Sequence, residues 1–188
     1  MTLFVFEGLP RCGKTTLIRE LSKDLNALHI YEIMDKNCCE LLPSEIGAVT
    51  QRFFFNNDAR KYALAKKYAH KKIVIMDRGY LSTIAYNLCL IKSEKQLSKK
   101  YRPGTIYVYI RISPEMSMAR RKKKPNNPED MWSYFNNLCE TEIFYEQRLN
   151  NSNTIAVDGS LSYRSLYSII HSFILQRENA KARRHNSR

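Results

Sequence analysis

The sequence predicts a three-layer α/β fold in which helices flank a five-stranded parallel sheet, and three observations lead to this prediction. Short runs rich in β-branched and aromatic residues alternate with longer segments of helical spacing. The run 72–77 and its neighbours have the apolar character of strands buried on both faces. Alternating strands and helices require crossover connections, which pair the strands in parallel. The predicted strands are 3–7, 29–33, 72–77, 105–112 and 154–158, and the predicted helices are 14–25, 45–70, 81–91, 114–122, 130–149 and 161–177.

Length and composition indicate one folded domain over residues 1–177. The chain has 188 residues, of which 44% are hydrophobic and 26% charged, as in an ordinary globular protein with a packed core. Residues 178–188 are basic and lack apolar periodicity, so we expect a disordered tail there. Residues 120–129 run from a basic cluster into a proline-bearing loop, and we expect this segment to form a short mobile lid.

Charge and cysteine content narrow the class of protein. The formal net charge of +13 attracts phosphorylated small molecules, nucleic acid or anionic membranes, and does not choose among them. The five cysteines are odd in number and include no C-x-x-C pair, so we expect reduced thiols in a cytoplasmic protein rather than disulfides or zinc. No run reaches the roughly 18 apolar residues of a membrane span, and the apolar start 1–8 is too short for a signal sequence.

The clearest motif is the segment Gly8–Thr15, which has the pattern G-x-x-x-x-G-K-T between a predicted strand and a predicted helix. In such a loop the backbone N–H groups face a phosphate, Lys14 neutralises phosphate oxygens and Thr15 offers a hydroxyl to Mg²⁺. The alternative is a chance glycine-rich turn, but the flanking strand and helix favour a site for ATP and Mg²⁺. The candidate nucleotide-binding residues of the loop are Gly8, Cys12, Gly13, Lys14, Thr15 and Thr16.

A carboxylate and a guanidinium stand together at the end of the third predicted strand, as Asp77 and Arg78. Ligands of open parallel sheets gather at the carboxyl ends of the strands, where both side chains are expected. Asp77 can hold Mg²⁺ or position the attacking group, which makes it a metal candidate with Thr15, and Arg78 can bind a phosphate. The alternative is that Asp77 caps the next helix and Arg78 is solvated.

Further candidates surround this centre. Glu7, Glu32 and Asp35 lie at or near strand ends and offer carboxylates to an acceptor group or to Mg²⁺. The basic pair Arg120 and Arg121 begins the lid, where it either closes onto phosphates or simply complements a helix dipole. The segment 53–60, with the sequence FFFNNDAR, is expected to flank an acceptor pocket through Phe55, Asp58 and Arg60, although aromatic residues at helical spacing also pack in cores.

Four stretches of the chain resemble the thymidylate kinase family, in the same order and across nearly the whole domain. Phe6-Glu7-Gly8-Leu9, which runs into Gly13–Thr16, is similar to the first strand and phosphate loop of that family. The stretch 77–86 resembles its D-R-Y-x-x-S-x-x-A-Y segment, with Ser82 and Tyr86 at matching positions. Residues 112–115 with Arg120 resemble its P-E-x-x-x-x-R segment, and residues 157–160, including Asp158, resemble the end of its last strand beside the adenine site.

This resemblance implies a P-loop kinase fold, ATP and Mg²⁺ as cofactors, and phosphoryl transfer to a nucleoside monophosphate. Arg78 is then expected to contact the acceptor phosphate, and Arg11, Arg120 and Arg121 to engage the transferring phosphate. The candidate catalytic residues are therefore Arg11, Lys14, Asp77, Arg78, Arg120 and Arg121, and Asp158 joins the nucleotide-binding residues. The candidate substrate-binding residues are Glu7, Asp35, Phe55, Asp58, Arg60, Arg78, Ser82 and Tyr86.

Three functional hypotheses follow, and the first is a nucleoside monophosphate kinase for a pyrimidine deoxynucleotide. The second keeps the chemistry but transfers the phosphate to a nucleoside or another hydroxyl-bearing small molecule, with Glu32 or Asp35 as base. Pro10 makes it credible, because thymidylate kinases carry an aspartate at this position of the loop. The third, a nucleic-acid-binding protein, rests on net charge alone, so nucleic acid is not an expected partner. The sequence is compatible with a homodimer.

Overall fold

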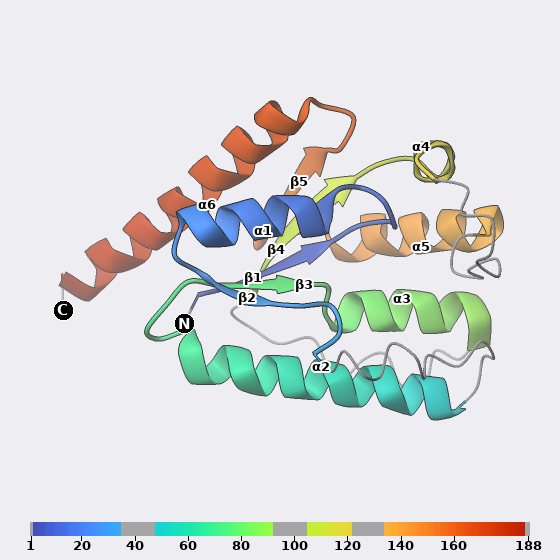
Figure 1. The fold of residues 1–188 in the computed structure, drawn as a ribbon, viewed down its shortest axis with the longest axis horizontal. Helices are drawn as coiled ribbons and strands as arrows, with labels where there is room; N and C mark the ends of the chain where they lie inside the picture. The colour runs from blue at the N-terminus through green and yellow to red at the C-terminus, as the bar shows by residue number, and fades with distance from the viewer. Residues whose placement is uncertain (1, 35–47, 92–104, 122–133, 187–188) are drawn as a thin grey trace.

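The structure is a computed structural model that describes residues 2–34, 48–91, 105–121 and 134–186 (Figure 1). Strands and helices alternate along most of this chain. In order they are β1 (Leu3–Glu7), α1 (Lys14–Asp24), β2 (Leu28–Ile30), α2 (Ala48–Tyr68), β3 (Val74–Asp77), α3 (Tyr80–Ile91), β4 (Thr105–Arg111), α4 (Pro114–Ala119), α5 (Phe135–Arg148), β5 (Thr154–Asp158) and α6 (Tyr163–Asn186).

The five strands form one parallel sheet in the order β2-β3-β1-β4-β5. Helices α1 and α6 cover one face, and α2, α3 and α5 cover the other (Figure 1). The predicted three-layer α/β fold is therefore confirmed. Because all strands run the same way, the segments that follow them meet at one edge of the sheet.

Two apolar cores result from the alternation of side chains along each strand. Leu3 and Val5 of β1 pack with α2, α3 and α5, whereas Phe4 and Phe6 pack with α1 and α6. Strands β3 and β4 divide their side chains between the cores in the same way, which explains why the central strands are apolar on both faces.

Most predicted elements lie within a few residues of their predicted bounds, but the C-terminal tail differs. Residues 178–186, expected to be disordered, continue helix α6 to Asn186. This stretch lacks an apolar stripe, but alanine, lysine, arginine and glutamate are strong helix formers that extend an existing helix readily. Lys181 also anchors the helix, since its Nζ donates to Thr2 Oγ1 at 3.0 Å. Among the described residues, no helix is both long and apolar enough to cross a membrane.

Two neighbouring isoleucines of α6 test the packing of this helix. Ile170 is 0% exposed in the core beside α1, whereas Ile169 is 41% exposed. We expect Ile170→Ala to lower the free energy of unfolding by about 2–5 kcal/mol through the cavity it leaves, and Ile169→Ala to lower it by less than about 1 kcal/mol. Urea denaturation measures both values, and equal losses would contradict the placement of α6.

Candidate active site

The candidate active site lies where the two central strands β1 and β3 end. They pair in parallel with Phe6 opposite Asp77, so the loop after β1 and the turn after β3 begin side by side. The Arg78 backbone N–H donates to Phe6 O at 3.0 Å and continues this contact beyond the strands. The two strongest motifs of the sequence, Gly8–Thr15 and Asp77-Arg78, therefore share one site.

The loop Gly8–Thr15 follows a path that its glycines allow. Gly8 has φ +141°, and a Cβ atom there would lie 2.5 Å from the backbone oxygen of Ile110 on β4. Gly13 has φ +95° and caps the N-terminus of α1, at which Lys14 is the first residue. Residues that carry a side chain rarely adopt such φ values, so glycine is required at both positions. The N–H groups that open α1 favour the binding of an anion.

Lys14 turns back over this loop. Its Nζ donates to the backbone oxygens of Gly8 and Leu9, both at 2.9 Å, and to Cys12 Sγ at 3.2 Å. The side chain is only 5% exposed. A buried ammonium thus stands beside the positive end of the α1 dipole, which makes the loop strongly attractive to a phosphate.

Thr15 and Asp77 form the direct link between the two motifs. Thr15 Oγ1 donates to Asp77 Oδ2 at 2.7 Å, and Asp77 is 2% exposed. The second carboxylate oxygen, Oδ1, is buried and accepts no hydrogen bond from the described part of the chain. Mg²⁺ at nucleotide sites is held by one or two carboxylates together with phosphate and water, so this pair fits the ion. The described residues contain no cluster of three or more His, Cys, Asp or Glu that would suit another metal.

Arg78 has an unusual backbone and a dense set of contacts. Its φ of 58° is left-handed, a conformation that costs a non-glycine residue about 1–2 kcal/mol. Its Nη1 donates to Gly8 O and to Ser82 Oγ, both at 3.0 Å. Its Nε lies 2.9 Å from Glu32 Oε1, and the Glu32 side chain is 50% exposed. A half-exposed carboxylate therefore stands beside the buried guanidinium, at the end of the neighbouring strand β2.

Glu7 lies beneath the site rather than on its surface. It is completely buried; its Oε1 accepts from the Gly79 N–H at 3.0 Å and its Oε2 accepts from Ser82 and, at 3.3 Å, from Tyr145. Burial raises the pKa of Glu7 to about 7, although Ser82 and the nearby cations oppose the rise. Glu7 and Ser82 were expected to bind substrate, but both are buried and instead support the turn after β3.

Helix α2 supplies a second buried group. Asp58, another expected substrate residue, is buried, accepts from Thr83 Oγ1 at 2.7 Å and lies 3.6 Å from Lys61 Nζ. Arg60, expected to meet an anionic group, is exposed, whereas Phe55 is half-buried against the core and near Tyr80.

Lys61, which is fully buried on α2, was not predicted from the sequence. The helical spacing could have indicated its burial, since Lys61 lies on the same face of α2 as the buried residues Asp58, Tyr62 and Ala65. Tyr145 was not predicted either, because nothing in a local pattern relates α5 to β1.

The far side of the phosphate loop is held by α4 and the residue after it. Ser117 Oγ donates to Pro10 O at 2.8 Å. Arg120 donates from Nη1 to Arg11 O at 3.4 Å and from Nη2 to Gly159 O at 2.9 Å. Arg120 therefore bridges the loop and the turn after β5.

Other predicted site residues are placed only in part. Arg121 is half-buried at the end of the described segment, and the lid residues 122–129 lie outside it, as does Asp35. Tyr86 belongs to α3. The Asp158 carboxylate accepts from the Ser160 N–H at 2.8 Å, which lowers its pKa, and it is exposed at the end of β5.

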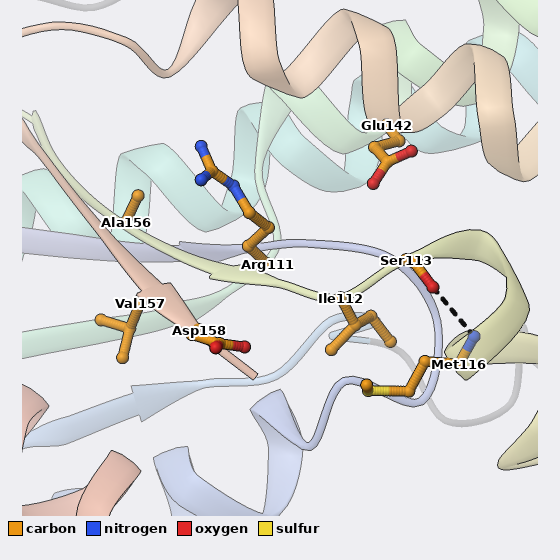
Figure 2. Close-up of a pocket in the computed structure, with 8 residues that line it drawn as sticks. All are labelled: Arg111, Ile112, Ser113, Met116, Glu142, Ala156, Val157 and Asp158. Carbon is orange, nitrogen blue, oxygen red and sulfur yellow. Dashed lines mark hydrogen bonds between the residues drawn. The ribbon is translucent and has the colours of Figure 1, made fainter. Parts of the chain in front are cut away.

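A pocket of about 340 Å³ opens beside Asp158, at the carboxyl ends of β4 and β5 (Figure 2). Helix α5 carries Glu142 over one side of it, and Ser113 caps α4 on the other, with its Oγ accepting from the Met116 N–H at 3.2 Å (Figure 2). The remaining lining residues are Arg111, Ile112, Ala156 and Val157. Arg111 pairs with Glu146 at 2.5 Å, so its charge is already balanced.

The loop geometry and the Thr15–Asp77 pair define the class: this is a P-loop nucleotide-binding protein. Residues 3–164 match the family described as AAA domain, and the chain belongs to that family. No curated protein matches the chain by sequence.

Solved structures share the fold. Deoxyadenosine kinase from M. mycoides with bound dATP has a TM-score of 0.68 and 19% identity, covering 93% of this chain and 99% of its own. Deoxyadenosine kinase from M. mycoides with the products dCMP and a flexible dCDP bound has a TM-score of 0.71 and 20% identity, covering 94% and 100%. The predicted P-loop kinase fold is confirmed, and the likeness to thymidylate kinases in particular stays a prediction.

The buried Glu7 makes stability depend on pH. Its pKa is raised from 4.5 to about 7 on folding, so the stability due to its proton is complete below pH 4.5 and is lost as the pH rises through about 7. In Glu7→Gln this loss is absent. The difference in the free energy of unfolding between the variant and wild type should therefore shift in favour of the variant by up to about 3 kcal/mol between pH 4.5 and 8, at about 1.4 kcal/mol per pKa unit. Denaturation curves across this range measure the difference, and a constant difference would rule out the buried proton.

Proposed function

We propose that the protein transfers the terminal phosphoryl group of ATP to a hydroxyl group of a nucleoside. The observation that carries this proposal is the pair formed by Glu32 and Arg78, at 2.9 Å. It stands at the ends of β2 and β3, next to the Thr15–Asp77 pair of the donor site. A half-exposed carboxylate in this place has the reach and the solvent access of a general base for an acceptor hydroxyl.

The donor half of the reaction uses the phosphate loop. Lys14 and the N–H groups that open α1 bind the donor phosphates, and Thr15 with Asp77 holds Mg²⁺. Mg²⁺, when bound, neutralises charge on the phosphate oxygens. Arg120 bridges Arg11 O and Gly159 O, which places its guanidinium beside the phosphate loop.

The acceptor half uses Glu32 and Arg78. The acceptor oxygen gives its proton to Glu32 and forms a bond to the γ-phosphorus, while the bond to the β–γ bridging oxygen breaks and ADP leaves. Arg78 orients the Glu32 carboxylate and stands close enough to the loop, through Gly8 O, to stabilise charge that develops during transfer. The fold shared with deoxyadenosine kinases supports an acceptor of this class.

A nucleoside monophosphate is the alternative acceptor. The resemblance of residues 77–86 to thymidylate kinases favours it, because Arg78 would then bind the acceptor phosphate. The structure supplies the counterargument that Glu32 balances the charge of Arg78 and would repel a second anion at that point. A nucleoside fits this charge distribution better.

ADP release, coupled to a spectrophotometric assay, distinguishes the acceptors. Purified protein is supplied with ATP and Mg²⁺ and with a panel of deoxynucleosides, ribonucleosides and their monophosphates. We expect turnover with nucleosides, and Lys14→Ala should abolish it. Turnover with monophosphates alone would refute a nucleoside acceptor and would support a nucleoside monophosphate kinase instead.

Glu32→Gln tests the role of the base. We expect kcat to fall about 100- to 10,000-fold, since this is the usual contribution of a general base, with the KM for ATP nearly unchanged. Glu140→Gln, at an exposed glutamate of α5, is the matched control and should keep wild-type kinetics. A fall of less than about tenfold in Glu32→Gln would show that another group takes the proton.

A further inference from the structure

Lys61 of α2 is a fully buried cation whose contacts converge on the active site from below. Its Nζ donates to Asp77 O at 2.8 Å, to Arg78 O at 2.7 Å and to Glu32 O at 3.2 Å. The side chain is 0% exposed. Its hydrogen bonds thus end on the backbone of both members of the Glu32–Arg78 pair and of Asp77, the partner of Thr15.

These contacts favour the ammonium form of the side chain. Three donated hydrogen bonds use all three hydrogens of an ammonium, which a neutral amine does not have. Burial lowers the pKa of Lys61, while the nearby Asp58 opposes that shift. Asp58 lies 3.6 Å away and is itself fixed by Thr83 at the start of α3. The carbonyl oxygens and Asp58 together replace the water that the ammonium has lost.

The turn that Lys61 holds contains a residue with an unfavourable backbone conformation. Arg78 has a left-handed φ of 58°, a value that is unfavourable for residues other than glycine. Lys61 holds this turn by the backbone oxygens of Asp77 and Arg78, and Glu7 holds it by the Gly79 N–H, at 3.0 Å. A buried cation and a buried carboxylate therefore hold opposite polar groups of one strained turn.

Packing alone does not explain a lysine at this position. An apolar side chain of similar length would fill the same space next to Tyr62 and Ala65, and exchanging a buried ion pair for apolar residues is often neutral or stabilising. What an apolar residue does not supply is a set of hydrogen bonds that joins the segment after β2 to the turn after β3. These bonds help to set how Glu32 meets Arg78 and how the turn carries the Asp77 side chain.

We propose that Lys61 is a positioning residue of the active site, which sets the backbone of Glu32, Asp77 and Arg78 and so aims their side chains. The inference rests on the proposed phosphoryl transfer for its kinetic consequence, but its structural consequence is independent of activity. Lys61 does not touch the substrates; it acts through the turn after β3 and the end of β2.

The first test is Lys61→Met, which keeps the length of the side chain and removes the donors. We expect kcat to fall about 100-fold, the effect of a misplacement of about 1 Å in a catalytic group, and the KM for ATP to change less than about threefold. Amide hydrogen exchange over peptides covering residues 74–83 should become faster. Lys61→Gln, which retains two donors, should show intermediate values, and Lys66→Met, on the exposed side of α2, should match wild type.

The double variant Lys61→Met/Asp58→Asn separates positioning from stability. Lys61→Met alone leaves Asp58 buried without its cation, and the asparagine removes that unpaired carboxylate, so the melting temperature should recover toward wild type. We expect kcat to stay low and exchange over residues 74–83 to stay fast. Recovery of either quantity together with stability would show that Lys61 has only a structural role and would overturn the proposal.

Failure of the proposed function gives a different result. If wild-type protein phosphorylates no nucleoside but uses another acceptor, the kcat values of the variants and of wild type are both measured with that acceptor and compared. If it transfers phosphate to no acceptor at all, the proposed function is refuted, and the exchange rates in the double variant alone decide the role of Lys61. Exchange at the wild-type rate in that variant would overturn the positioning role.

Discussion

The parallel pairing of β1 with β3 is the constraint on which the rest of the site depends. It sets Phe6 opposite Asp77, so that the phosphate loop and the Asp77-Arg78 turn leave the sheet at the same level. The Thr15–Asp77 hydrogen bond and the contact from Arg78 to Gly8 O both follow from this register. A shift of one residue in the register of β3 would turn the Asp77 side chain to the other face of the sheet and break both contacts. The two apolar cores, one on each face, hold the register in place.

Beneath this edge the protein buries three ionisable groups. Glu7, Asp58 and Lys61 are each less than 3% exposed, and every one of them bonds to the turn after β3 or to the helix that follows it. Burial of charge is costly unless the group is paired and hydrogen-bonded. These buried charged groups gather around Arg78, whose backbone is left-handed. We infer that they are kept for the geometry of this turn, although an apolar core would contribute more free energy to folding.

The sequence predicted the parts of this arrangement that are local. Periodicity predicted the five strands, and the spacing of Gly8–Thr15 predicted the phosphate loop, because each depends on neighbouring residues. The pairing of Glu32 with Arg78 was not predictable, since it joins segments 46 residues apart through a left-handed turn that no motif encodes. Glu7 was expected to bind substrate because it adjoins the loop, yet it has the parity of Leu3 and Val5 and so lies buried on the face covered by α2, α3 and α5. The helical end of α6 was missed because its residues favour helix without marking a buried face.

The contacts of the loop backbone link the proposed donor and acceptor halves of the site. Gly8 O accepts from both Lys14 and Arg78, so the cation expected at the donor phosphates and the cation paired with Glu32 share one oxygen atom. On the opposite side, Pro10 O and Arg11 O are held by Ser117 and Arg120. Because Gly8 O has two donors, loss of the Lys14 hydrogen bond would leave it bonded to Arg78, while Pro10 O and Arg11 O keep their own partners. The Pro10 carbonyl is bonded to α4, and in the proposed reaction the acceptor meets Glu32 at the end of β2 rather than the Pro10 side chain.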